Sequence, residues 1–439
     1  MPASRGAESA NRPGRSSRGL AAGSLFAFVV LGLPDGMLGV AWPVLRHDFG
    51  QPLASLGELL LASVAGYLTV TGLAGSALRR TGTATILIGS AIVAAIATAG
   101  FTAARWWPEL VVASVLLGAA GGGLDAGLNT AIAVAGRTRL MNLIHAAFGV
   151  GAAIGPLLVT AALATSTSWR GAYGVLFLLE VCLLGVWISL RSRFPALPGQ
   201  REPDRYEPDR PEPDRPEPLE HEPLEHDPLE HDPLEHEQHD PEPQRTAARD
   251  PAHTLIGLSL AAFFCYAGVE IGTASWSASF LRGQDQLDPT LAGLAVFGYW
   301  AGLAAGRLLA AALGSRVSAR TAAIAGTIGT IAGAAGVWAN PGPSVAVAAL
   351  VITGLSLGPI FPALMNLTPG RLGSHAAVHV VGWQLAAGGI GGASLSALIG
   401  VILQQTGLTS LGPCLLLLAV LLAVLNLLLE RHATTARAA

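Results

Sequence analysis

The sequence predicts an all-α membrane protein whose twelve transmembrane helices form two pseudo-symmetric six-helix bundles. Hydrophobic residues make up 51% of the 439 residues and charged residues only 13%. Soluble domains carry about 25% charged residues, so a soluble fold could not bury this much apolar surface. Twelve apolar stretches are long enough to cross a bilayer, and a highly charged segment divides them into six and six.

The twelve predicted spans follow from length and composition. A helix needs about 20 mostly apolar residues to cross the hydrocarbon core. We expect spans over residues 20–45, 54–78, 83–103, 110–135, 141–164, 171–190, 254–281, 290–313, 320–339, 344–367, 376–403 and 409–429. The many glycines favour close helix packing, because small residues let helix backbones approach one another in lipid.

The arginine distribution predicts the orientation. With both termini in the cytoplasm, all arginines but four fall on the inner side, the exceptions being Arg46, Arg105, Arg170 and Arg282. This follows the positive-inside rule. The first apolar run is too long for a signal-peptide core and is read as an uncleaved helix. We therefore expect a multi-pass protein of the plasma or inner membrane with cytoplasmic termini.

The charged segment is predicted to be an extended cytoplasmic linker. Residues 201–250 hold 18 acidic residues and 6 arginines, and a proline recurs every five residues from Pro203 to Pro233. Proline at this spacing forbids a helix, and the charge forbids a core. The predicted organisation is a tail (1–18), a first bundle (19–193), the linker (194–252), a second bundle (253–430) and a tail (431–439).

The two halves of the chain carry similar residues at matching positions. Residues 121–129 and 358–366 carry Gly, Ala and Asn at matching offsets. Asp35 precedes Trp42 in the first span, and Glu270 precedes Trp276 in the seventh. Together with the six-plus-six layout, this pattern suggests paired bundles around a central site, as in transporters built from repeats.

Three lone carboxylates point to proton coupling. Asp35, Asp125 and Glu270 each interrupt an otherwise apolar span. A carboxylate in lipid costs a few kcal/mol on insertion scales and usually faces a polar cavity or moves a proton. The structural alternatives are a buried Asp that caps a kinked helix for Asp35 and interhelical hydrogen bonding for Asp125. Glu270 is predicted to be a second titratable or cation-binding site.

A second set of residues is predicted to bind a polar substrate. Asp125 and Asn129 share a helix face, and Glu270 continues a polar stripe on its own helix. The predicted substrate-binding residues are Asp125, Asn129, His145, Tyr266, Trp276 and Gln384. For His145, Trp276 and Gln384, plain packing is the alternative.

The remaining polar residues carry no predicted transport role. Glu180 lies in a span expected to be peripheral, and Arg307 is expected to reach the interface or hold a loop. The three cysteines are far apart, and the linker histidines recur every five residues, which matches no zinc geometry. We predict no metal, no cofactor, no nucleic-acid partner and no enzymatic activity.

The layout resembles the major facilitator superfamily. That family has a loop motif after its second helix, which Gly75, Arg80 and Gly82 match, while Arg79 stands where an Asp is usual. The resemblance implies twelve helices in two rocking bundles.

Local strings resemble the fucose/proton symporter branch. The matching segments are 32–36 with Trp42, 123–129, 142–148 and 264–276. His145 and Glu270 replace a Gln in the respective strings. The resemblance implies that Asp35 is the proton site and Asp125 a substrate-coupled site.

The predicted function is proton-coupled uptake of a small polar, sugar-like solute by alternating access. We expect a monomer whose partners are the solute, protons and the lipid bilayer. Efflux of a drug or metabolite by proton antiport is an alternative, because the same carboxylates serve either direction. A non-transporting receptor or scaffold is a lesser alternative, since it gives no reason for three intramembrane acids.

Overall fold

Long helices dominate the computed structural model, which describes residues 15–165, 167–194 and 251–438. No strand occurs within these ranges, and twelve segments in them are long and apolar enough to cross a membrane. The predicted all-α fold is therefore confirmed. Nearly all of the linker, residues 195–250, lies outside the described residues.

The first six spans form one helical bundle. Its helices are α1 (Arg15–Asp48), α2 (Leu56–Thr81), α3 (Thr83–Ala103), α4 (Trp107–Val134), α5 (Thr138–Ala164) and α6 (Ser168–Leu190). Helix α1 packs on α5 so closely that a Cβ on Gly32 or Gly36 would overlap the backbone of Phe148 or Ala152. Glycine is required here because only a bare Cα allows this approach.

The second bundle repeats the plan with one break. Its helices are α7 (Pro251–Gly283), α8 (Pro289–Leu313), α9 (Ala319–Ala339), α10 (Pro343–Leu357), α11 (Ile360–Leu372), α12 (Ser374–Thr406) and α13 (Leu411–Ala438). The predicted continuous span 344–367 is divided between α10 and α11 at Gly358 and Pro359. Proline lacks the N–H that would continue the helix ladder.

The last helix continues past the predicted end of the second bundle. We expected a tail from residue 431, whereas α13 runs to Ala438. Glu430 is held there by Arg371 of α11, at 2.6 Å, and by Arg320 of α9, at 3.1 Å. No glycine or proline follows to end the helix.

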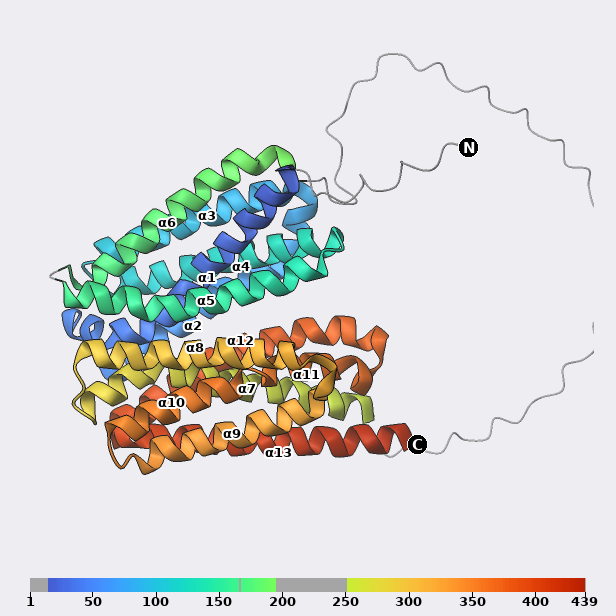
Figure 1. Cartoon of the computed structure of the whole chain (residues 1–439). Helices are drawn as coiled ribbons and strands as arrows, with labels where there is room; N and C mark the ends of the chain where they lie inside the picture. The colour runs from blue at the N-terminus through green and yellow to red at the C-terminus, as the bar shows by residue number, and fades with distance from the viewer. Residues whose placement is uncertain (1–14, 166, 195–250, 439) are drawn as a thin grey trace, which may run out of the picture. The chain divides into compact units, whose positions relative to one another are not determined.

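The two bundles meet near one end of the helices. In Figure 1 the blue-to-green helices and the yellow-to-red helices form two groups, with α5 beside α8. Gly293 of α8 packs on Thr160 of α5, and Gly39 of α1 packs on Ala274 of α7. These contacts lie in the halves of the helices farther from the N-terminus of α1, which is the side predicted to face outward.

A polar contact closes the same end. The backbone N–H of Ala54 donates to Oε1 of Gln404 across the bundles at 2.9 Å. On the opposite side, towards the start of α1, His145 of α5 is exposed. The two bundles are therefore in contact at the end that is predicted to face outward.

Candidate functional site

Asp35 lies in the middle of α1 and is nevertheless exposed. It borders a cavity of about 70 Å3 that α1 shares with helices of both bundles. The hydroxyl-bearing residues of the lining are Ser63, Ser114, Tyr173 and Ser275. A carboxyl group that contacts this space can exchange a proton with water, which a carboxyl group packed against lipid cannot do.

Asp125 on α4 is held by hydrogen bonds to both of its oxygens. The hydroxyl of Tyr67 donates to Oδ2 at 2.8 Å, and Nδ2 of Asn129 donates to Oδ1 at 2.8 Å. Asp125 and Asn129 are one helical turn apart, so their pairing is local. The Oδ1 of Asn129 is buried and makes no hydrogen bond with the described part of the chain. A bound hydroxyl could donate to it.

His145 on α5 connects the two bundles electrostatically. Its ring packs edge-on against Phe28 at 5.5 Å. It interacts through space with Asp125 of the first bundle and with Arg307 of the second. Since His145 is exposed, it is available to a solute that lies between these two charges.

Glu270 on α7 forms an ion pair with Arg307 on α8. Nη2 of Arg307 lies 3.2 Å from Oε1 of Glu270, and their side chains are 28% and 12% exposed. The hydroxyl of Tyr299 donates to the backbone oxygen of Glu270 at 2.8 Å. The hydroxyl of Tyr266 also interacts with Arg307. The Nε of Arg307 is buried and has no hydrogen-bond partner among the described residues.

Asp35 and Glu270 lie on helices of different bundles, α1 and α7. The carboxyl groups of Asp35 and Glu270 are close enough to interact electrostatically. Two like charges repel more strongly near protein than in bulk water. A charged Asp35 is therefore repelled by a charged Glu270.

The structure groups most of the predicted site residues and separates two of them. Hydrogen bonds, an ion pair or electrostatic interactions link six predicted residues, which we call the connected set: Asp35, Asp125, Asn129, His145, Glu270 and Tyr266. Trp276 is fully buried, and its Nε1 donates to the backbone oxygen of Ser396 at 2.9 Å. Gln384 is fully buried and bonds Ser259 and Thr368 inside the second bundle. A substrate role for Trp276 and Gln384 stays a prediction.

The expectation for Arg307 is wrong, because it pairs with Glu270 instead of reaching the interface. The sequence held a signal for it, since Arg307 is the only charge between residues 290 and 313. Tyr67 was missed for a different reason. Its bond to Asp125 depends on the register of α2 against α4, which Gly118 and Gly122 set by contacting the backbone of Ser63 and Tyr67.

Glu180 on α6 is 5% exposed, and its carboxyl group has no hydrogen bond or ion pair with any described residue. It belongs to a stripe that contains Tyr173, Leu176, Leu183 and Trp187, at spacings of three and four. The stripe packs into the first bundle, so Glu180 does not face lipid. It lies outside the connected set.

Solved structures share the fold over nearly the whole chain. A D-xylose-proton symporter aligns with a TM-score of 0.66 at 13% identity, covering 92% of this chain and 97% of its own. The nucleoside transporter NupG aligns with a TM-score of 0.68 at 12% identity, covering 94% and 99%. The peptide transporter POT aligns with a TM-score of 0.65 at 12% identity, covering 94% and 95%. At these identities the likeness shows the fold alone.

No curated protein matches the chain. The model of the Major Facilitator Superfamily matches residues 24–285, which is more than half of the sequence. This match agrees with the twelve spans, the two bundles and the charged residues at the centre. The chain belongs to the Major Facilitator Superfamily, a family of multi-pass membrane transporters.

Proposed function

We propose that this chain is a proton-coupled secondary active transporter of a small, polar, sugar-like solute. The observation that carries the proposal is the exposed carboxyl group of Asp35 at mid-span, within electrostatic reach of Glu270 in the other bundle. Protonation of Asp35 neutralises it and removes its repulsion from Glu270. The bundles then exchange which end is closed, and loss of the proton on the other side resets them.

The charges of the central residues favour a neutral solute over an anion. Three acidic groups, Asp35, Asp125 and Glu270, face Arg307 and His145. An anionic solute would meet an excess of acidic groups, which disfavours binding. A hydroxyl can both donate and accept, so a polyol has the groups to pair with an acceptor such as Oδ1 of Asn129 or a donor such as Nε of Arg307, each of which has no partner among the described residues.

Transport in proteoliposomes tests the proposal. The full chain is reconstituted, an inward proton gradient is imposed, and uptake of radiolabelled monosaccharides is measured. We expect Asp35→Asn to abolish uphill uptake while solute exchange without a gradient persists. Glu180→Gln is the matched control, because it neutralises an intramembrane acid that lies outside the connected set. Full uphill uptake by Asp35→Asn would refute the coupling role.

The direction of transport is tested in whole cells. Solute addition that makes the external medium alkaline indicates uptake with protons, whereas acidification indicates efflux by antiport. Deleting residues 201–245 separates a carrier from a scaffold. A carrier keeps most of its transport without the linker, whereas a scaffold that docks partners through the linker loses its function.

The proposed setting is the plasma or inner membrane, with a monomer whose termini face the cytoplasm. The arginine distribution supports this orientation.

A further inference from the structure

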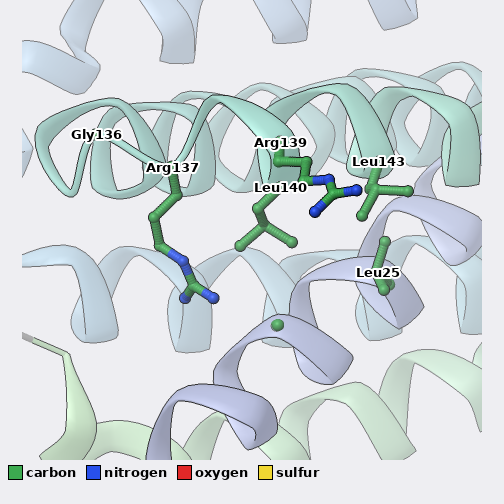
Figure 2. Close-up of a pocket in the computed structure, with 7 residues that line it drawn as sticks. Leu25, Gly136, Arg137, Arg139, Leu140 and Leu143 are labelled. Atoms are coloured by element: carbon green, nitrogen blue, oxygen red, sulfur yellow. The ribbon is translucent and has the colours of Figure 1, made fainter. Parts of the chain in front are cut away.

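A groove lies between the first turns of α1 and the start of α5. It encloses about 470 Å3 and is lined by Ala21, Leu25, Gly136, Arg137, Arg139, Leu140 and Leu143. Figure 2 shows the side chain of Arg137 extending into the space between the two helices, with Leu140 on the α5 side and Leu25 on α1. A single water occupies about 30 Å3, so the space is much larger than one ion needs.

The lining changes from charged to apolar along the membrane depth. Arg137 precedes the fifth span and Arg139 is its first residue, whereas Leu140 and Leu143 lie inside it. Leu25 lies inside the first span. Leu143 is 51% exposed. The groove thus presents cations at the membrane boundary and an apolar wall below them.

The positive charge in the groove is not neutralised locally. Neither the guanidinium group of Arg137 nor that of Arg139 forms a hydrogen bond or ion pair with the described part of the chain. Arg193 adds a third guanidinium beside the start of α1, where its Nη1 lies 3.0 Å from the position of a Cβ on Gly19. Basic pockets between helices at the cytoplasmic boundary bind anionic lipid head groups.

We propose that this groove binds one acidic phospholipid, with the phosphate between Arg137 and Arg139 and the glycerol and upper acyl chain along Leu25, Leu140 and Leu143. A free phosphate would use the arginines and leave the apolar wall uncovered. An amphiphile covers both. The ligand is a lipid of the leaflet towards which the first helix begins, so it binds near the membrane boundary and not at mid-span, where Asp35 lies.

Lipid binding to the purified full-length protein tests the proposal. Native mass spectrometry measures retention of phosphatidylglycerol against phosphatidylcholine. The variant Arg137→Gln/Arg139→Gln is compared with Arg79→Gln/Arg80→Gln, which removes the same charge from the exposed end of α2. We expect roughly 30-fold weaker phosphatidylglycerol binding in the first variant, because each arginine near an acidic head group contributes on the order of a tenfold effect or less. We expect little change in the control variant.

Two further measurements distinguish a bound phospholipid from a bound free phosphate. Leu25→Trp fills the apolar wall and keeps every charge, so it should also weaken lipid binding. Inorganic phosphate should not displace the lipid. Equal losses in the two arginine variants, or full competition by phosphate, would overturn the proposal. So would a gain of lipid binding only after deletion of residues 201–245, because the acidic linker would then be the occupant.

Discussion

Arg307 of α8 and Glu270 of α7 form an ion pair at 3.2 Å in the interior of the second bundle. The anion of this pair, Glu270, is also close enough to the carboxyl group of Asp35 in the first bundle to interact with it electrostatically. The cation keeps Glu270 compensated when Asp35 loses its proton. The acidic pair across the bundles is therefore modulated by a third, basic partner.

Replacing only Arg307 of this pair should destabilise the protein more than replacing both Arg307 and Glu270. Arg307→Gln leaves Glu270 without its cation, and a one-sided break of a buried pair costs up to about 3–5 kcal/mol. The loss is smaller here because Arg307 keeps 28% of its side chain exposed. Thermal unfolding of the detergent-purified protein should show that the double variant Glu270→Gln/Arg307→Gln recovers part of the loss. Additive losses would contradict direct coupling.

Tyr67→Phe should destabilise the protein by about 1.5–3 kcal/mol, because a hydrogen bond to a charged group contributes this much. The lost bond is that of the Tyr67 hydroxyl to Oδ2 of Asp125. Tyr173→Phe is the matched control, since its hydroxyl forms no hydrogen bond with the described residues and its ring stacks on Phe101. The same melting measurement applies. Equal melting temperatures for Tyr67→Phe and Tyr173→Phe would contradict a stabilising hydrogen bond between Tyr67 and Asp125.

Gly118→Ala should be poorly tolerated. A Cβ at this position would lie 1.8 Å from the backbone oxygen of Ser63, so α2 and α4 would have to separate. Overpacking costs about 1–3 kcal/mol or more. Gly72→Ala, which meets no atom within 4 Å, should be neutral or slightly stabilising. Monodispersity of the solubilised protein and its melting temperature report both effects.

The access of water to the centre should differ between the two faces of the membrane. In a variant without native cysteines, His145→Cys should react with a membrane-impermeant thiol reagent from the side of the N-terminus. Thr160→Cys should stay unreactive, because Thr160 is buried against Gly293. Labelling of right-side-out and inverted vesicles measures the difference. Faster reaction of His145→Cys from the opposite face would reverse the assignment of the open side.

The sequence was sufficient to predict the fold and to locate the acidic residues within the spans. Hydropathy located all twelve spans, because a lipid-facing helix needs apolar residues along its length. Asp35, Asp125 and Glu270 were identified because an intramembrane charge is rare enough to indicate function. Signals of this kind are local, so one sequence contains them.

The partners of these residues were not predictable in the same way. Tyr67 meets Asp125 only because glycine contacts fix the register between α2 and α4. Gln384 was expected near the substrate, but Ser259 and Thr368, from two other helices, bind it inside the second bundle. Such pairings depend on helix rotation and depth, which periodicity along one helix does not determine.

The break between α10 and α11 gives the second bundle a joint that has no counterpart in α4 of the first. Gly358 lies against the backbone of α8 at Leu303, and Pro359 interrupts the helix ladder beside it. The outer half of this span is fixed to α8 through Gly354, which contacts the backbone of Tyr299. The inner half is attached to α13 through the ion pair of Arg371 with Glu430, so bending at the joint would move α13 with it. Opening and closing of the inner mouth can therefore be an unequal movement, in which one half of the molecule bends and the other turns as a block.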